Sequence, residues 1–366
     1  IGVILIFIFP QLADTVFQFG TYSLDIVTAY TLYLSSLTLS SIWIPDIPIV
    51  LIILYYGALL LLLADTSHRS RIFALSLLIV SLVLFIVPVT GITNSFRSSH
   101  SVSFIDVGQG SSTLIQLSGG RTILVDGGAT TTPGFDCGER IIAPYLWSQG
   151  IGHIDDIVLT HDDADHYNGI SALLERFRPS RLWIPEYQSE KPGYNALISK
   201  ARRRGVKIIN PQQGIFISSE QATLSRISTN QTDMEGSSPL NQSKYNNNDN
   251  SLIVSLRTRD FSVLLPGDIS SDKERSLIRT NSRLEHDILL SPHHGSLTSN
   301  SPGFLNAVNP RYLIVSAGKR RKLLFPSSQT KKSAGTMGIE LLATNRYGTI
   351  MVRGNNGDFE IKTTAY

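Results

Sequence analysis

The fold of this chain is decided by the stretch IVLTHDDADHYNGI, residues 157–170. The apolar residues 157–159 predict a buried strand that stops at Thr160. Two imidazoles and two carboxylates follow within six residues: His161, Asp163, Asp165 and His166. The carboxylates would repel each other unless a cation lay among them. The stretch therefore predicts a metal site at a strand end, and the alternative is an acidic, solvated loop.

The spacing His-x-Asp-x-Asp-His resembles the His-x-His-x-Asp-His signature of the metallo-β-lactamase superfamily, with Asp163 in place of the second histidine. It is the form carried by ComEC-type proteins of bacterial DNA uptake and by their phosphodiesterase relatives. The resemblance implies a four-layer αββα fold and hydrolysis at a metal centre. We expect this domain to cover residues 96–366, where strand and turn units begin.

Two acids follow expected strands earlier in this domain. Asp106 opens the segment DVGQGSS, and Asp126 opens DGG after a strand expected at residues 121–125. Both segments are similar to the family's, and the resemblance implies that these acids support the metal loop without binding the ion. The alternative is that both merely cap turns. Ser111 departs from the family pattern, which has an acid there.

The later segments PGDI and SPHHGS complete the resemblance. It implies that Asp268 bridges two metals and that His294 is the last ligand. His293 would then orient substrate or protonate a leaving group, although either histidine could be the ligand. Asn250 and Ser251 resemble a family segment at the rim of the site, where they would bond a phosphoryl oxygen or cap a turn.

The resemblance implies two divalent cations. One would be bound by His161, Asp163 and Asp268, and the other by Asp165, His166, Asp268 and His294. This oxygen-rich set favours Mn²⁺ over Zn²⁺. Two such ions can activate water and hold a phosphodiester, so we expect phosphodiester hydrolysis with Asp165 and His293 as catalytic residues.

The first 95 residues differ in composition from residues 96–366, because they are nearly all apolar. We expect a helix at residues 21–44 and membrane spans at 47–64 and 72–90, as the end of a channel domain. Arg69 and Arg71 predict a cytoplasmic loop between the two spans, which places the later domain on the outer face. Because the chain starts without Met and inside an apolar run, we expect it to be the tail of a larger protein.

The ComEC resemblance implies a bacterial inner-membrane protein that acts on DNA, with a DNA receptor and a translocation ATPase as partners. A basic cluster would contact the phosphate backbone or form a solvated loop: Lys319, Arg320, Arg321 and Lys322. It stands where relatives carry a histidine. The net charge of +3 is too small to indicate nucleic-acid binding alone, and the single Cys137 excludes an internal disulfide framework.

Two other functions stay open. The altered Ser111 and the missing histidine are compatible with an inactive domain that binds DNA or braces the channel. The metal motif alone is also compatible with a hydrolase of a small ester or phosphodiester. Between the motifs, residues 218–250 are rich in Ser, Asn and Gln, and we expect them to include a mobile insertion.

Overall fold

The computed structural model describes most of the chain: residues 9–36, 49–64, 67–86, 99–129, 135–211, 214–219, 221–227, 247–280, 283–318 and 325–365. The chain divides into two compact units, Ile1–Ile44 and Pro45–Tyr366. This boundary does not fall at residue 95, and the division there into a membrane part and a hydrolase part stays a prediction.

The amino-terminal third forms three helices within the described residues: α2 (Pro10–Ser36), α3 (Ile49–Leu63) and α4 (His68–Ile86). None of the described helices combines the length and the hydropathy that a membrane crossing requires. The 15 residues of α3 extend about 22 Å, short of a hydrocarbon core of ~30 Å, and α4 opens on the polar sequence HRSR. The spans expected at 47–64 and 72–90 are thus not found, and an end of each lies outside the described residues.

The metal motif follows a strand of the larger of two sheets. Within the described residues this sheet has eight strands, ordered β15-β14-β1-β2-β3-β4-β5-β6. Their bounds are β1 (Ser101–Phe104), β2 (Thr113–Gln116), β3 (Thr122–Val125), β4 (Asp156–Val158), β5 (Arg181–Trp183), β6 (Lys207–Ile209), β14 (Ile350–Asn355) and β15 (Asp358–Thr363). The strand expected at 121–125 is confirmed as β3, which pairs antiparallel with β2, and β3 to β6 run parallel.

The second sheet carries the later motifs. Its described strands are ordered β13-β12-β11-β10-β9-β8-β7. Their bounds are β7 (Gly214–Ser218), β8 (Ala222–Ile227), β9 (Ile253–Thr258), β10 (Ser262–Leu265), β11 (Ile288–Leu290), β12 (Tyr312–Val315) and β13 (Glu340–Ala343). Strands β10 to β13 run parallel, so their carboxyl ends lie at one edge.

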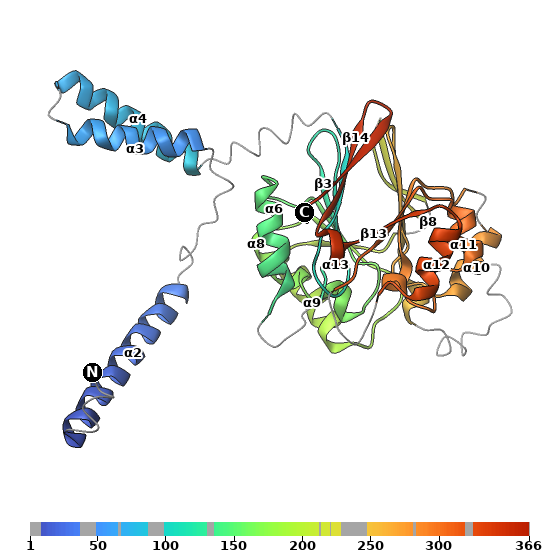
Figure 1. Cartoon of the computed structure of the whole chain (residues 1–366), viewed down its shortest axis with the longest axis horizontal. Helices are drawn as coiled ribbons and strands as arrows, with labels where there is room; N and C mark the ends of the chain where they lie inside the picture. The colour runs from blue at the N-terminus through green and yellow to red at the C-terminus, as the bar shows by residue number, and fades with distance from the viewer. Residues whose placement is uncertain are drawn as a thin grey trace. The chain divides into compact units, whose positions relative to one another are not determined.

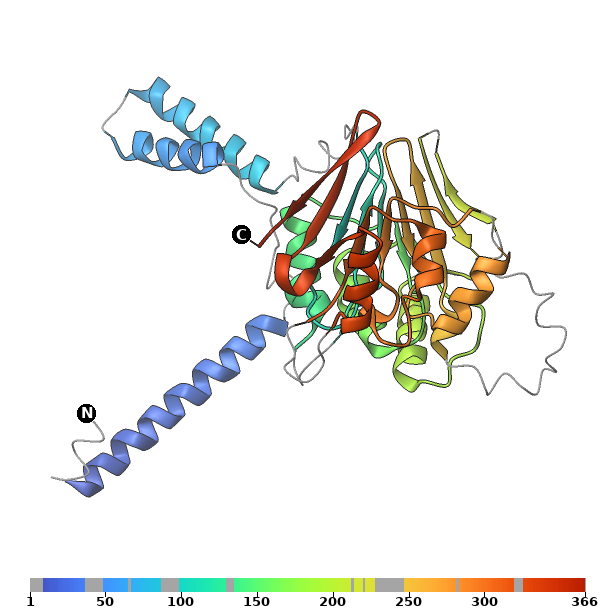
Figure 2. The same cartoon turned by 45° about the vertical axis from the view of Figure 1, so that its right-hand side comes forward.

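The two sheets face each other between two layers of helices (Figures 1 and 2). The first sheet is covered by η1 (Gly138–Ile142), α6 (Ala143–Ser148), α7 (Ala164–Tyr167), α8 (Ile170–Arg176) and α9 (Pro192–Arg203). The second is covered by α10 (Ser271–Thr280), α11 (Pro302–Val308) and α12 (Ser328–Thr336), whereas η4 (Asn247–Asn250), η5 (Pro292–Gly295) and α13 (Thr344–Tyr347) are single turns between strands. The expected four-layer αββα fold is confirmed.

Alternate side chains of the central strands enter different apolar layers. In β10, Val263 and Leu265 pack between the sheets, and Leu264 packs under the outer helices. In β3, Ile123 and Val125 likewise point inward while Leu124 points to the helices. Each fully buried aliphatic side chain contributes roughly 1.5 to 3 kcal/mol. Burial on both faces explains why these strands are continuous apolar runs.

Two details of the local structure were not expected from the sequence. The helical segment before β4 starts as the π-helical turn η1 and only then becomes α6. The polar segment 218–250 contains a strand, β8, which pairs with β7 and β9 because its Ala222 and Leu224 enter the core between the sheets. Residues 228–246 of this segment lie outside the described residues, so the insertion expected within 218–250 stays a prediction.

Buried His286 should make the stability of this domain depend on pH. Its Nδ1 donates to the Leu284 carbonyl (2.9 Å), and its Nε2 accepts from the Ser255 hydroxyl (2.7 Å). Burial lowers the pKa of His286 from 6.5 to about 4. The unfolded chain therefore binds a proton between these values that the folded chain does not, and stability falls as pH drops from 6.5 towards 4.

We expect up to about 3 kcal/mol of pH-dependent stability from His286, at ~1.4 kcal/mol per pKa unit. Urea unfolding at pH 7 and pH 4.5 should show a smaller loss for His286→Gln than for the parent chain. Equal losses in the two proteins would contradict this prediction.

Candidate metal centre

Three segments deliver ligand side chains to one place. Strand β4 leads into the loop and the short helix α7 that carry Asp165 and His166, β10 leads to Asp268, and β11 leads to His294. The polar residues follow the carboxyl ends of parallel strands, which meet at one edge of each sheet. Ligand atoms of Asp165, His166, Asp268 and His294 all lie within 4.8 Å of one another. The four residues that were assigned to one predicted ion are thus brought together.

Asp268 lies between the two imidazoles of this group. Its Oδ1 lies 3.3 Å from His166 Nε2, and its Oδ2 lies 3.5 Å from His294 Nε2. His294 Nε2 is also 3.3 Å from Asp165 Oδ2. The Asp268 side chain is 6% exposed and that of Asp165 is 39% exposed, so the centre is closed on one side and open on the other.

The hydrogen bonds of the imidazoles define their tautomers. His166 Nδ1 donates to Asp126 Oδ2 (2.7 Å), and His294 Nδ1 donates to the Ser316 carbonyl (3.0 Å). His161 Nδ1 donates to the Thr160 hydroxyl (2.9 Å), because that hydroxyl gives its own proton to Asp126. In the neutral form of each ring, Nε2 is therefore the nitrogen without a proton.

These bare nitrogens are the strongest indication of a cation. Nε2 of His161, His166 and His294 is buried in each case and has no hydrogen-bond partner within the described residues. A buried lone pair without a partner is costly, and coordination removes that cost. A second ring nitrogen bonded to a carboxylate or carbonyl is the usual arrangement of metal-binding histidines. The residues present therefore fit a divalent metal ion.

The acids and imidazoles compensate one another in charge. Burial lowers the pKa of His166, but the Asp268 and Asp126 carboxylates outweigh burial and raise it well above its ordinary value. Burial raises the pKa of Asp165, whereas the His294 and His166 imidazoles lower it to about 2. A bound cation would replace the imidazole protons as the balancing charge.

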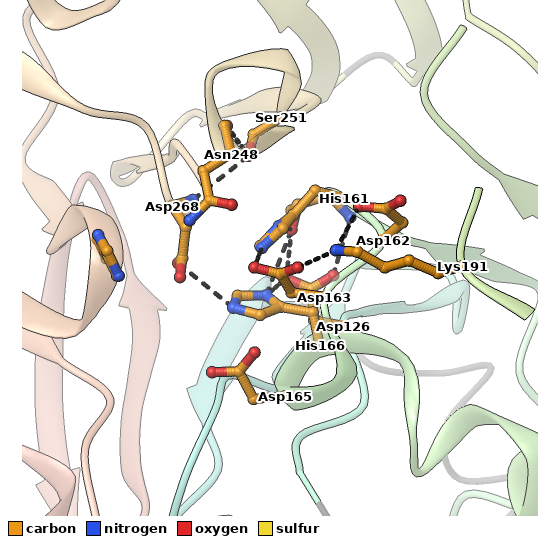
Figure 3. Close-up of polar contacts among 12 residues, drawn as sticks. Asp126, His161, Asp162, Asp163, Asp165, His166, Lys191, Asn248, Ser251 and Asp268 are labelled. Atoms are coloured by element: carbon orange, nitrogen blue, oxygen red, sulfur yellow. Dashed lines mark hydrogen bonds and ion pairs between the residues drawn. The ribbon is translucent and has the colours of Figure 1, made fainter. Parts of the chain in front are cut away.

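Asp126 holds the metal loop from behind, as the resemblance implied. It is 2% exposed, and its carboxylate accepts from the Thr160 amide (2.8 Å), the Thr160 hydroxyl (2.8 Å) and His166. Figure 3 shows Asp126 next to His166. Asp106 instead accepts from the Gly108 amide (3.2 Å) and so caps a turn.

Of the residues expected at the rim of the site, one supports Asp268 and the others lie apart from the four clustered residues. Ser251 Oγ accepts from the Asp268 amide (3.4 Å) and donates to the Asn248 carbonyl (2.6 Å), so it fixes the backbone at Asp268. Asn250 is exposed, and the buried neighbour in this turn is Asn248. The imidazole of His293 contacts the Thr298 hydroxyl (3.2 Å) and is not among the four clustered ligands. The geometry therefore favours His294 over His293 as the ligand.

The second expected ligand group is not assembled. His161 Nε2 lies 3.5 Å from Asp163 Oδ2, but these two do not join Asp268 in a cluster of three ligand atoms in the described part of the chain. Asp163 has another partner in Lys191, whose ammonium is ion-paired with Asp163 Oδ1 and, at 3.0 Å, with Asp162 Oδ1. Burial lowers the pKa of Lys191, but both carboxylates outweigh it and raise the pKa.

Several contributing residues were not found from the sequence. Thr160, Asp162, Ser189, Lys191 and Ser316 lie on loops, and the sequence pattern does not show which loops meet. Thr160 alone carried a signal, because a hydroxyl directly before the metal motif can bond the histidines. The basic cluster 319–322 lies outside the described residues, so its contact with DNA stays a prediction.

Gly110 allows the first glycine loop to approach the metal loop. The Ser111 amide donates to the Asp165 carbonyl (3.2 Å), and a Cβ at Gly110 would lie 1.9 Å from that oxygen. We expect Gly110→Ala to lower the free energy of unfolding by about 3 kcal/mol or more, as steric displacement adds to the strain of φ +89°. Gly119→Ala is the control, because φ is +83° there but nothing lies within 4 Å, and it should cost only ~1 to 2 kcal/mol. Equal losses in urea unfolding would contradict this prediction.

Replacing Asp126 by Asn should weaken metal binding. The amide nitrogen cannot accept a hydrogen bond, so either Thr160 or His166 loses its acceptor and the His166 ring is no longer fixed. We expect a roughly 10- to 100-fold lower affinity for Mn²⁺ by titration calorimetry. Asp287→Asn is the control, since Asp287 accepts bonds from Ser262 outside the centre. Unchanged affinity in Asp126→Asn would refute the supporting role.

Comparison with known proteins agrees with this architecture. Residues 105–318 match the model of the metallo-beta-lactamase superfamily. The chain is 28% identical to ComE operon protein 3 of Bacillus subtilis (strain 168) over 333 residues, which are 85% of this chain and 40% of that protein. It is 26% identical to competence protein ComA of Neisseria gonorrhoeae over 321 residues, 84% of this chain and 40% of that protein.

Among solved structures, the metallo-beta-lactamase fold protein YhfI from Bacillus subtilis is 13% identical, with a TM-score of 0.44 over 70% of this chain and 100% of that chain. The chain thus spans about two fifths of the length of the two curated relatives. It belongs to the metallo-β-lactamase superfamily, and its homologues are competence proteins of the ComEC type.

Proposed function

We propose that this chain is a metal-dependent phosphodiesterase that cleaves DNA during its uptake across the bacterial inner membrane. One observation carries the proposal: two buried imidazoles with bare Nε2 atoms and two carboxylates converge within 4.8 Å at the end of parallel strands. Such a centre suits a hydrolase. The names of the homologues tie them to competence, which favours DNA as the substrate.

With a divalent cation bound, the centre gains a Lewis acid that polarises a phosphoryl oxygen and makes a nearby water more acidic. Two carboxylate and two imidazole ligands suit Mn²⁺ as well as Zn²⁺, and the oxygen ligands favour Mn²⁺. Asp165, whose pKa is about 2, is ionised at neutral pH and would orient the attacking water. His293, positioned by Thr298, would give the proton of its Nε2 to the leaving oxygen.

We further propose that the amino-terminal helices anchor the enzyme at the membrane, with the hydrolase domain on the outer face. Large apolar side chains on these helices are exposed in the chain by itself, among them Leu63 at 83%, Phe19 at 75% and Ile49 at 71%. Water-exposed apolar surface of this extent is rare in soluble monomers. A DNA receptor and a translocation ATPase are the partners that such a location would provide.

The test is cleavage of end-labelled single-stranded DNA by the whole chain in detergent with Mn²⁺. Asp268→Asn should lower the rate by at least ~100-fold, since about 3 kcal/mol of transition-state stabilisation depends on the bound cation. Asp272→Asn, which changes an exposed acid that pairs with Arg275, should leave the rate unchanged.

A metal-loaded chain that leaves DNA intact would refute the nuclease proposal. Faster turnover of a chromogenic small phosphodiester than of DNA would then identify a small-molecule hydrolase. Metal-dependent DNA binding without turnover would identify an inactive, DNA-binding domain.

A further inference from the structure

Lys191 lies at the place where a second metal ion would be expected. Figure 3 shows its side chain extending to Asp163 and Asp162, on the side of the centre away from Asp165. Its Nζ is ion-paired with Asp163 Oδ1 and lies 3.0 Å from Asp162 Oδ1. One ammonium therefore balances two neighbouring carboxylates.

The position of Lys191 is fixed by contacts outside the metal centre. The Asp162 side chain is 1% exposed, so its charge requires a partner, and it also accepts from Ser189 Oγ at 2.5 Å. The Lys191 amide donates to the same Ser189 hydroxyl (3.1 Å), and the Lys191 carbonyl accepts from the Asn195 amide (3.1 Å) in the first turn of α9. The lysine is thus held by Asp162 and by the start of a helix.

This placement leaves too few ligands for a second cation. Asp163 Oδ1 is taken by the ammonium, and only Asp163 Oδ2 and His161 Nε2, 3.5 Å apart, still face each other. A catalytic metal site normally has three protein ligands, and the described residues supply no third one for this pair. A cation there would also be repelled by the ammonium.

The ammonium can also act towards the substrate as a second cation would. It has three donors, and the described residues give it two carboxylate partners. The side chain is 35% exposed, so a phosphoryl oxygen can reach the third donor. A point charge with a free donor is a common phosphate ligand.

We propose that Lys191 takes the place of the second metal ion, and that the centre binds one divalent cation through Asp165, His166, Asp268 and His294. The inference rests on the proposed function for the role of Lys191 at a phosphodiester. It proposes one ion where the resemblance implied two, because an ammonium from another loop neutralises Asp163.

The test is the number of Mn²⁺ ions bound per chain, measured by equilibrium dialysis and metal analysis of the whole chain. The parent protein should bind one equivalent, and Asp165→Ala should bind none. Lys191→Met has an uncharged, unbranched side chain that is one atom shorter. It frees Asp163 Oδ1 and Asp162 Oδ1, so it should raise the number from one to two. The electron paramagnetic resonance spectrum should change from that of an isolated Mn²⁺ ion to that of an exchange-coupled pair.

Lys200→Met is the matched control. Lys200 lies on α9, the helix that directly follows Lys191, and pairs with Glu175 at 2.7 Å outside the centre, so this variant should still bind one equivalent. Two equivalents in the parent protein would overturn the inference, as would one equivalent or none in folded Lys191→Met. If Lys191→Met does not fold, the test rests on the number of Mn²⁺ ions bound per parent chain. One equivalent supports the inference, and two equivalents overturn it.

The number of bound ions and the rate of DNA cleavage, both measured on the parent protein, separate this inference from the proposed function. One bound ion without DNA cleavage would refute the nuclease proposal and leave the single-ion centre standing. DNA cleavage by a parent protein that binds two ions would support the nuclease proposal and overturn the single-ion inference.

Discussion

The buried carboxylate of Asp126 is the interaction on which the metal centre depends. Its three acceptor bonds tie the end of β3 to Thr160, at the end of β4, and to the ring of His166. The Asp126 backbone reinforces this link, since its amide donates to the Val158 carbonyl (2.9 Å). A shift of one strand against the other would break these bonds together, and the imidazole would lose its orientation.

The packing of the two sheets completes the centre. Asp165 and His166 follow a strand of the first sheet, while Asp268 and His294 follow strands of the second. Neither sheet therefore supplies the four residues alone. The inward-facing residues of β3 and β10 form the apolar layer between the sheets and hold the two ligand pairs at bonding distance. The cation would therefore link the two halves of the domain, and its binding would contribute to folding.

Charge balance separates the two sides of the metal loop. On the side of Asp165 the carboxylates face imidazoles, whose bare Nε2 atoms indicate a cation. On the side of Asp163 the balancing charge is a lysine. A loop with three acids thus uses a metal for one part and an ammonium for the other, which explains how it folds without mutual repulsion of its carboxylates.

The sequence by itself determined the central strands, three of the four clustered residues (Asp165, His166 and Asp268) and the resemblance to the superfamily. Strand ends followed by Asp165, Asp268 and His294 are local patterns, and the fold brings strand ends of one direction to a common edge. Only the tertiary structure decided that His294 and not His293 enters the centre, that Asp106 caps a turn, and that β8 lies within a polar segment. It also decided that Asp163 is ion-paired with Lys191, which lies 28 residues away on a loop. A contact between two loops depends on the packing of the elements that carry them, which no spacing in the sequence records.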